Sequence, residues 1–257
     1  MPAKIMDGRI LAQKIKLELK EQVRALNERG IEPSLTTILV GKNPASVTYL
    51  RNKHSACAEV GIVSHNTELP AETSQMELED LISRLNGDQS VSGILLQLPL
   101  PKGLDDSATI SLIAPGKDVD GLNPRNLGLL FGKTAKLVPC TPKGVMAMLK
   151  YYGVEIAGGH AVIINRSKLV GRPLSQLMLN EDATVTVCHS KTHGLMEIAR
   201  TADILITGIG HRSEFAVTAQ MVKPEAAVVD VGISSVGGRL MGDVDFASAA
   251  QVAKYIS

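Results

Sequence analysis

The chain has 257 residues, of which 44% are hydrophobic and 21% are charged, and its formal net charge at pH 7 is +1. This composition is typical of a globular protein with one large or two modest domains, and the charge gives no support to a nucleic-acid-binding surface or a polybasic membrane patch. No apolar run approaches the roughly 20 residues of a membrane span, and no signal peptide is visible. We therefore expect neither a nucleic-acid nor a membrane partner and predict a cytoplasmic protein.

Strands and helices alternate along almost the whole chain, a pattern typical of an α/β protein with parallel sheets. A first helix is expected to begin after Asp7, which can cap it, and to end at Gly30. The next elements are expected as strand 35–41, helix 43–60, strand 62–69, helix 74–85 and strand 91–98. Asn43 can cap the first of these two helices, and Ser74 with Glu77 forms a capping box for the second.

In the second half, a mixed segment leads to a helix at 140–153, with Thr141 as its expected cap and Pro142 as its first residue. The remaining elements are expected as strand 161–164, helix 171–180, strand 184–189, helix 194–201, strand 203–210 and strand 226–233. We place a single domain boundary near residue 139, between domains of residues 1–139 and 140–257. Ligands of open α/β sheets bind beyond the carboxyl ends of strands, so the residues that follow strands are candidates for a site.

The cysteines and histidines predict no disulfide and no metal site. Cys57, Cys140 and Cys188 are odd in number and far apart, which argues against a disulfide framework and for a reducing compartment. His189 and His193 form only half of a metal site, because no third ligand lies nearby in the sequence.

Polar residues in the first half are candidates for catalysis. Tyr49 and Lys53 lie four residues apart in an expected helix and therefore share one face, although spacing alone favours a solvated face. Gln97, at the end of an apolar strand, could hold the lysine amine for acid–base chemistry or could be solvated at a sheet edge. Asp118 and Asp120 precede a glycine turn, and each could form an Asx-turn or bind amino groups of a ligand.

The stretch AVIINRSKLVGRP, residues 161–173, predicts a strand, a turn and the start of a helix. The dinucleotide-binding fingerprint G-x-G-x-x-G would place three glycines in this turn, but only Gly171 is present. Backbone amides at helix N-termini bind phosphates, so the turn could still hold a cofactor by other means. The alternative is an ordinary junction between a strand and a helix.

An ordered set of short motifs runs along nearly the whole chain. The set comprises Asn43-Pro-Ala-Ser46, Tyr49-x-x-x-Lys53, Gly93-Ile-Leu-Leu-Gln97-Leu-Pro-Leu-Pro101, Lys117-Asp-Val-Asp-Gly121, Pro139-Cys-Thr-Pro142, Arg166-Ser167-x-x-Val170-Gly171-x-Pro173, Thr184-Val-Thr186, His189-Ser-Lys-Thr192, Ala202-Asp-Ile-Leu-Ile206, Val229-Asp-Val-Gly-Ile233 and Gly242-Asp-Val244. In order and spacing this set resembles the bifunctional methylenetetrahydrofolate dehydrogenase/methenyltetrahydrofolate cyclohydrolase family.

The resemblance implies two three-layer αβα domains, a folate-binding catalytic one and a C-terminal Rossmann-type one, with the active-site cleft between them and a homodimer formed through the C-terminal domain. It implies oxidation of 5,10-methylenetetrahydrofolate to 5,10-methenyltetrahydrofolate and hydrolysis of that product to 10-formyltetrahydrofolate. Lys53 would be the catalytic acid–base, which a permanently charged arginine could not be. Tyr49 would orient the pterin, Gln97 would hydrogen-bond Lys53, and Asp120 would anchor the pterin amino groups. Substrate binding is assigned to Tyr49, Gln97, Leu98, Pro99 and Asp120.

The resemblance also assigns the cofactor. In the family the turn usually reads Gly-Arg-Ser-x-x-Val-Gly, and here its first residue is Asn165, the non-glycine residue that best tolerates positive φ. Arg166 suits the 2′-phosphate of NADP and Ser190 can add a hydroxyl, so we expect NADP in preference to NAD. Gly208 and Gly210 could pack against the dinucleotide or form a plain turn after a strand. The other expected cofactor residues are Ser167, Gly171, His189, Thr192, Ile209, Gly232 and Ile233.

The resemblance ends at Tyr255-Ile-Ser257, where the family normally continues with a Pro-Val-Pro-Gly-Gly-Val-Gly-Pro-Met-Thr loop and a last helix. Three functions therefore stay open: a bifunctional NADP-linked enzyme, an enzyme with only one of the two activities, and a cofactor-binding protein without catalysis. The set of Tyr49, Lys53, Gln97 and Asp120 argues against the third, because a binding module has no use for a positioned lysine.

Overall fold

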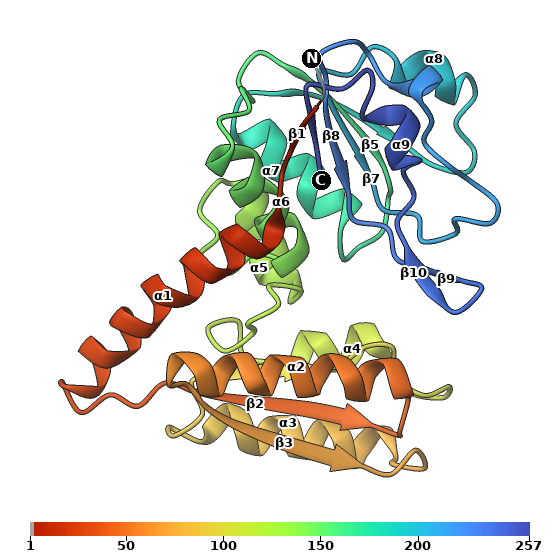
Figure 1. Ribbon diagram of the computed structural model, residues 1–257. Coiled ribbons are helices and arrows are strands. Elements are labelled where there is room, and N and C mark those ends of the chain that lie inside the picture. The colour runs from red at the N-terminus through yellow and green to blue at the C-terminus, as the bar shows by residue number, and fades with distance from the viewer. Residues whose placement is uncertain (1–2) are drawn as a thin grey trace. The chain divides into compact units, whose positions relative to one another are not determined.

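The computed structural model of the chain describes residues 3–257, which divide into two compact units (Figure 1). The N-terminal unit comprises Ala12–Leu129 and Ala135–Val138, and the C-terminal unit comprises the chain up to Leu11, Leu130–Thr134 and Pro139–Ser257. Two helices, α1 (Gly8–Asn27) and α5 (Pro124–Phe131), begin in one unit and end in the other. None of the helices described is long and apolar enough to cross a membrane.

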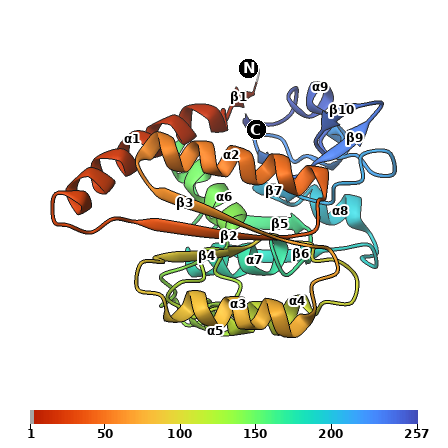
Figure 2. The same ribbon diagram turned by 90° about the horizontal axis from the view of Figure 1, so that it is seen from below.

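The N-terminal unit is built on a parallel three-stranded sheet in the order β3-β2-β4. Its elements are β2 (Ser34–Val40), α2 (Pro44–Val60), β3 (Val63–Leu69), α3 (Gln75–Gly87), β4 (Gly93–Leu96) and α4 (Asp106–Leu112). Side chains alternate along β2, so Ile38 packs with Leu78 and Ile82 of α3, while Leu39 packs with Leu50 of α2. Helices therefore cover both faces of the sheet, as Figure 2 shows.

The helix starts of this unit confirm the predicted caps. The Asn43 side chain accepts hydrogen bonds from the amides of Ala45 and Ser46 at the start of α2. At the start of α3, both hydrogen bonds of the Ser74–Glu77 capping box are present, and they hold the pKa of the Glu77 carboxyl below its usual value. Local side-chain chemistry thus fixes where each helix begins.

The C-terminal unit contains a parallel sheet of six strands in the order β1-β11-β8-β7-β5-β6. The strands are β1 (Lys4–Ile5), β5 (His160–Ile164), β6 (Thr184–Cys188), β7 (Ile204–Thr207), β8 (Ala227–Asp230) and β11 (Tyr255–Ile256). The helices are α6 (Cys140–Tyr151), α7 (Gly171–Asn180), α8 (Leu195–Ala199), the 3-10 helix η1 (Ala219–Met221) and α9 (Phe246–Ala249). The chain passes from β5 to β6 on one side and returns to β7 on the other, so the strand order reverses beside β5.

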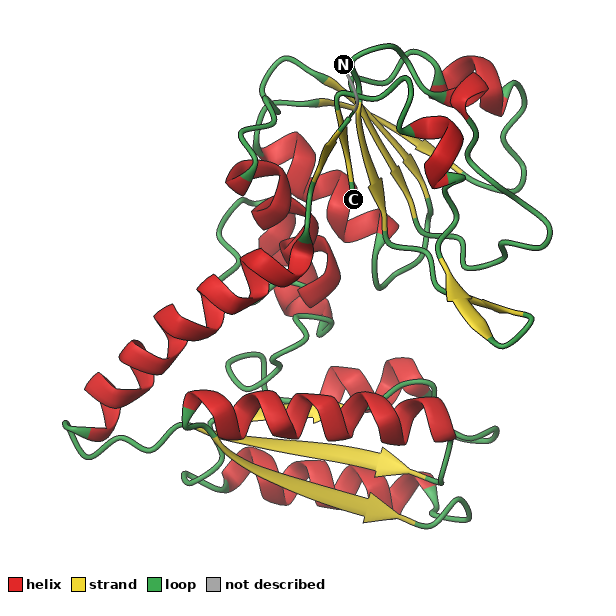
Figure 3. Cartoon of the chain, viewed as in Figure 1, coloured by secondary structure: helices red, strands yellow, loops and turns green. Residues whose placement is uncertain are grey.

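Both faces of this sheet are apolar and covered by helices. Ile163 packs with Leu149 of α6 and Leu174 of α7 on one face, and Ile164 packs with Ala199 of α8 on the other. This confirms the expected fold class, with two α/β units of three layers and a doubly wound C-terminal one. Figure 3 shows the short antiparallel hairpin of β9 (Ser234–Val236) and β10 (Arg239–Met241) set apart from the sheet.

Several boundaries differ from those predicted. Strands β7 and β8 end three residues earlier than expected, at Thr207 and Asp230, because the backbone beyond each turns to hydrogen-bond with side chains. The expectation that Thr141 caps α6 was wrong. The amide of Lys143 already donates to the carbonyl oxygen of Pro139, so the helix includes Thr141 and begins at Cys140.

The beginning of the chain belongs to the C-terminal unit. β1 is an edge strand there, with Lys4 opposite Tyr255 and Ile5 opposite Ile256, and the side chain of Met6 is buried in the apolar cluster under the sheet. The prediction of a single boundary near residue 139 had instead assigned this segment to the first domain. A strand of two residues has no periodicity that a sequence pattern could reveal.

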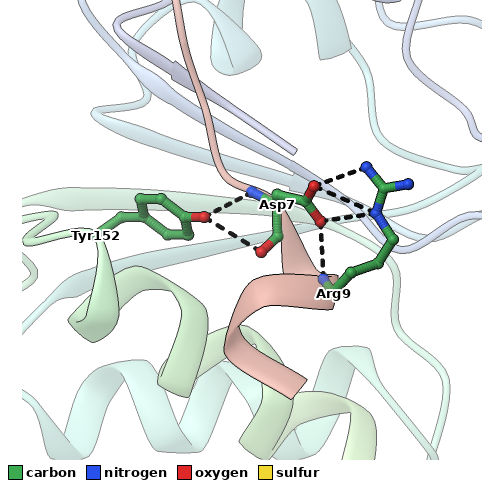
Figure 4. A network of polar contacts seen from close by, with 3 residues as sticks. All are labelled: Asp7, Arg9 and Tyr152. Atoms are coloured by element: carbon green, nitrogen blue, oxygen red, sulfur yellow. Dashed lines mark hydrogen bonds and ion pairs between the residues drawn. The ribbon is translucent and has the colours of Figure 1, made fainter. Parts of the chain in front are cut away.

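A small polar network anchors the start of α1 (Figure 4). The Tyr152 hydroxyl accepts a hydrogen bond from the amide of Asp7 over 2.8 Å and donates one to its carbonyl oxygen over 3.2 Å. The Asp7 carboxylate accepts from the amide of Arg9, which confirms it as the cap of α1, and from the Arg9 side chain. The side-chain hydrogen bond from Arg9 lowers the pKa of Asp7 to about 2.

Replacing Tyr152 with Phe is expected to lower the free energy of unfolding by about 1 kcal/mol, because the partly buried amide of Asp7 loses its hydrogen-bond partner. Replacing Arg9 with Ala is the matched control, and it should leave stability unchanged since the Arg9 side chain is 91% exposed. Urea denaturation of both variants measures the difference. Equal midpoints for Tyr152→Phe and the unmodified protein would contradict the anchoring role.

Candidate functional site

A cavity of about 450 Å³ lies in the C-terminal unit at the carboxyl ends of β5, β6 and β7. Six of the predicted cofactor residues line it: Asn165, Arg166, His189, Ser190, Gly208 and Ile209. The cavity also lies beside the point where the strand order reverses, which is where open α/β sheets bind ligands. The sequence-based prediction did not include three further lining residues, His211, Glu214 and Phe215, which come from the loop after β7.

Asn165 organises the turn that follows β5. Its side-chain oxygen accepts hydrogen bonds from the amides of Ser167 over 2.7 Å and Gly171 over 3.0 Å, and its side-chain nitrogen donates to the carbonyl oxygen of Gly208. Asn165 does not adopt the positive φ that its residue type tolerates, since it is not among the described residues with positive φ. It acts through its carboxamide and not through its backbone freedom.

Gly171 is required by the close approach of two backbone segments. A Cβ atom at this position would lie 2.0 Å from the carbonyl oxygen of Asn165, so any residue other than glycine would overlap that oxygen. The single glycine of the fingerprint is therefore the one that lets the first residue of α7 pack against the end of β5.

The turn after β6 brings together the other polar residues of the cavity. The amide of His189 donates to the Thr192 hydroxyl over 2.9 Å, and the amide of Lys191 donates to Nδ1 of His189 over 3.1 Å. Thr192 and His189 thus shape the turn, which leaves Ser190 exposed at the cavity together with the exposed Arg166. A guanidinium and a hydroxyl are the donors that a phosphate group requires.

Asp243 supports the loop after β7, a role that the sequence-based prediction missed. The side chain is fully buried, and its carboxylate accepts from the Thr207 hydroxyl over 2.9 Å and from the amides of Ile209 over 2.5 Å and Gly210 over 2.9 Å. A Cβ at Gly232 would lie 2.3 Å from the Asp243 carboxyl carbon, so only glycine fits there. The available signal in the sequence was the aspartate itself, which is the one charged residue of the Gly242-Asp-Val244 motif.

In the N-terminal unit, Lys53 and Tyr49 lie together on α2 as their spacing predicts. The Lys53 amine is 5.0 Å from the centre of the Tyr49 ring, a cation–π distance, and the Lys53 side chain is half-buried. Cys57, one turn further on the same face, is buried, which raises the pKa of its thiol despite the nearby Lys53 charge. The amine of Lys53 therefore has an aromatic neighbour and a neutral thiol.

Gln97 follows β4 directly. Its amide still donates to the carbonyl oxygen of Ile38 over 2.9 Å, so the residue is fixed at the carboxyl end of the sheet. Its side-chain nitrogen donates to the carbonyl oxygen of Leu98 over 2.7 Å, and the bond between Leu98 and Pro99 is cis. In this arrangement the Gln97 carboxamide is hydrogen-bonded to the next residue, Leu98, and its hydrogen bond to Lys53 stays a prediction.

The two aspartates of the Lys-Asp-Val-Asp-Gly motif have different environments. Asp118 is buried and accepts hydrogen bonds from the amide of Asn123 over 2.7 Å and from the side chain of Asn126 over 2.9 Å. The backbone of the motif pairs with Ile94 of β4 at the edge of the sheet, and the Val119 side chain packs with the cluster that includes Leu50 of α2. Asp118 is thus occupied by structural hydrogen bonds, whereas Asp120 is half-buried and its substrate role stays a prediction.

His54 connects α2 to the sheet beside Lys53, and it was not predicted as a site residue. Its Nε2 lies 3.0 Å from the Thr37 hydroxyl and its Nδ1 lies 2.8 Å from the Ser64 hydroxyl. The Thr37 hydroxyl also donates to the Asn66 side chain over 2.9 Å. Thr37, a buried polar residue within the apolar strand β2, was the available signal. The network sets the position of the helix that carries Lys53.

The cysteines form no disulfide within the described range, 3–257. Burial raises the pKa of the Cys188 thiol, as it does for Cys57, so both thiols are protonated near neutral pH. Nowhere in the same range do three His, Cys, Asp or Glu side chains gather as a metal site would require.

Comparison with known proteins matches both parts of the chain. Residues 6–120 match the catalytic domain, and residues 139–257 the NAD(P)-binding domain, of tetrahydrofolate dehydrogenase/cyclohydrolase. The bifunctional protein FolD of Nitrosopumilus maritimus is 50% identical over 250 residues, which cover 97% of this chain and 87% of that protein. The chain belongs to the tetrahydrofolate dehydrogenase/cyclohydrolase family. This confirms the resemblance inferred from the ordered motifs.

Solved structures of this tetrahydrofolate dehydrogenase/cyclohydrolase family superpose closely. The crystal structure of the bifunctional FolD methylenetetrahydrofolate dehydrogenase/cyclohydrolase from Campylobacter jejuni has a TM-score of 0.96 at 44% identity, covering 99% of this chain and 90% of that one. The Trypanosoma brucei methylenetetrahydrofolate dehydrogenase-cyclohydrolase, solved with NADP and an inhibitor, has a TM-score of 0.93 at 40% identity, covering 100% and 90%.

In this family member the two groups of predicted residues fall in the two matched domains. Tyr49, Lys53, Gln97 and Asp120 lie in the region that matches the catalytic domain, and the cavity lies in the region that matches the NAD(P)-binding domain. The donor set of the cavity fits a dinucleotide that carries an extra phosphate, because Arg166 supplies a fixed positive charge there.

Proposed function

We propose that this protein oxidises 5,10-methylenetetrahydrofolate to 5,10-methenyltetrahydrofolate with NADP and hydrolyses the product to 10-formyltetrahydrofolate. The observation that carries the proposal is the cavity beside the strand-order reversal, lined by Arg166 and Ser190, in a chain that also holds Lys53 against Tyr49. Family membership supports both reactions, since the family combines the dehydrogenase and the cyclohydrolase. NADP, when bound, supplies the acceptor for the hydride.

Lys53 carries the proton transfers of the hydrolytic step in this proposal. Water adds to the methenyl carbon, and the neutral amine of Lys53 accepts the proton that the water loses. The resulting ammonium then returns a proton to N5 of the pterin as the bond between N5 and the one-carbon unit breaks. The hydroxyl group of the adduct loses its proton to solvent and becomes the carbonyl of the formyl group on N10. The lysine starts and finishes the cycle in the same protonation state, as a general acid–base must.

Tyr49, Gln97 and Asp120 position the substrate. The Tyr49 ring, 53% exposed on α2, offers an aromatic face against which a pterin can pack. Asp120 accepts hydrogen bonds from the pterin amino groups, and Gln97, with Leu98 and Pro99 after β4, borders the same substrate. Support comes from the backbone of Gln97, which is fixed at the carboxyl end of the sheet, and from the match of the region that holds Asp120 to the catalytic domain of the family.

The cofactor contacts follow from the cavity. Arg166 and Ser190 bind the 2′-phosphate, which selects NADP over NAD, because an arginine pairs with a phosphate through charge-assisted hydrogen bonds. Gly208, Ile209 and Gly210 form the wall opposite. The remaining proposed contacts are Ser167, Gly171, His189, Thr192, Gly232 and Ile233.

Mixing the purified protein with methylenetetrahydrofolate and either NADP⁺ or NAD⁺ tests the proposal. Absorbance of methenyltetrahydrofolate should rise with NADP⁺ and then decay as 10-formyltetrahydrofolate forms. A rise without the enzyme-dependent decay would reduce the function to the dehydrogenase alone. No change with either cofactor, together with no hydrolysis of added methenyltetrahydrofolate, would overturn the proposal.

The same proposal places the protein in the cytoplasm as a homodimer formed through the C-terminal unit. The odd number and wide spacing of the three cysteines support a reducing compartment. Exposed apolar side chains at the hairpin, with Leu240 79% exposed beside Val236 and Met241, support a contact with a second copy. Sedimentation velocity of the purified protein gives its oligomeric state.

A further inference from the structure

One side chain joins the two loops that face the cavity of the C-terminal unit. The loops are residues 165–170, after β5, and residues 208–210, after β7. Asn165 lies in the first loop, and its side-chain nitrogen donates to the carbonyl oxygen of Gly208 in the second. The two loops follow the neighbouring strands β5 and β7, so this hydrogen bond joins them directly beyond the carboxyl ends of the two strands.

The other end of the same carboxamide fixes the first loop internally. The Asn165 oxygen accepts from the amides of Ser167 and Gly171, over 2.7 and 3.0 Å. The next amides are also used within the turn, since Val170 donates to the Ser167 hydroxyl over 3.0 Å and Arg172 donates to the Ser167 carbonyl oxygen over 3.1 Å. The backbone amides with which a helix N-terminus ordinarily binds an anion are therefore engaged inside the protein.

The second loop is held from its other side as well. The buried carboxylate of Asp243 accepts from the amides of Ile209 and Gly210, while Asn165 binds the carbonyl oxygen of Gly208. Gly208, Ile209 and Gly210 thus each have a backbone group that is hydrogen-bonded to a side chain from a different part of the chain, either Asn165 or Asp243. The loop is a fixed wall of the cavity in the absence of any ligand.

We propose that Asn165 is a positioning residue that couples the two loops before the cofactor binds. Anion recognition then falls to the side chains of Arg166 and Ser190, because the first amides of α7 are already occupied. Binding to a preformed surface costs less ordering of the protein, so the coupling strengthens cofactor binding. The identity of the ligand as NADP rests on the proposed function, whereas the coupling itself is a property of the ligand-free protein.

Hydrogen exchange of the ligand-free protein tests the coupling directly. In Asn165→Ala, the amides of Ser167 and Gly171 should exchange about tenfold faster, because they lose their acceptor. The amides of Ile209 and Gly210 should also exchange faster, although both bond to Asp243 and neither touches Asn165. In Asn165→Asp, which keeps the acceptor oxygens and loses the donor, only the amides of Ile209 and Gly210 should respond.

Cofactor binding gives the second readout. Calorimetric titration with NADP⁺ should show a dissociation constant about tenfold higher for Asn165→Ala than for the unmodified protein. Gln176→Ala is the matched control, since it also removes a carboxamide from the β5–α7 region but bonds only to Asn180 within α7. Its exchange and its NADP⁺ affinity should stay unchanged.

The outcomes separate the two proposals. Unchanged exchange at Ile209 and Gly210 in both Asn165 variants would overturn the coupling, whatever the unmodified protein binds. If the unmodified protein does not bind NADP⁺ but exchange at these amides increases in the variants, the proposed function fails and the coupling of the loops stands.

Discussion

Replacing Lys53 with Met is expected to reduce cyclohydrolase turnover by about 10³-fold, which is the usual scale for the loss of a general acid–base. The reduction arises because Lys53 carries the proposed proton transfers, while its neighbours on this face of α2 are the Tyr49 ring and the protonated thiol of Cys57. Methionine keeps the unbranched stem that packs beside Tyr49, so the helix should keep its position. Turnover of added methenyltetrahydrofolate measures the effect, with NADP⁺ affinity as the check that the protein is folded.

Arg51→Met is the matched control for this variant. Arg51 is an exposed cation on the same helix, two residues from Lys53 and therefore on a different face. Its loss should leave turnover within about twofold of the unmodified protein, because surface substitutions outside a site usually have small effects. Full cyclohydrolase activity in Lys53→Met would refute the assignment of Lys53.

Replacing Arg166 with Ala is expected to lower kcat/KM for NADP by roughly 10- to 100-fold, the scale of one or two charge-assisted hydrogen bonds to a phosphate. The value for NAD should change little, because NAD lacks the 2′-phosphate. Arg166 lines the cavity beside Ser190, and its own carbonyl oxygen is held by the Arg172 side chain over 3.2 Å, which fixes the start of the side chain. Steady-state rates with both cofactors measure this change in the preference for NADP over NAD.

The control for Arg166 is Arg200→Ala, which removes an exposed arginine of the same unit outside the cavity-lining set. It should leave the preference for NADP intact, which distinguishes a local contact from the loss of one positive charge. The unmodified protein must prefer NADP for the assignment to hold. A preference for NAD, or an equal loss with both cofactors in Arg166→Ala, would contradict it.

Much of the fold could be predicted because its signals are local. Asn43 begins α2 and Ser74 with Glu77 begins α3 through hydrogen bonds that span two or three residues, and such contacts are visible in a short window of sequence. The pairing of β1 with β11 could not be predicted, since it depends on residues at opposite ends of the chain. Strands of two residues also lack any alternation of polar and apolar side chains.

The candidate site shows the same division. The shared face of Tyr49 and Lys53 follows from the helical repeat, so spacing predicts it. Asn165 was predicted from the conformational preference of its residue type, which it does not use, because its side chain instead reaches Gly208, a contact no sequence spacing encodes. Asp243 was missed for the same physical reason, as its partners come from another loop.

The placement of β1 in the sheet of the C-terminal unit has a consequence for folding during synthesis. A ribosome releases β1 first and its neighbour β11 only after every other strand of that sheet. The main segment of the N-terminal unit, Ala12–Leu129, has emerged by then, so we expect it to gain its core while translation continues. β1 and Met6 must wait, with their apolar surface unpaired, until β11 reaches them. The nascent chain therefore depends on a strand that is produced early and docked late. We expect chaperones that shield apolar segments to bind this strand during synthesis.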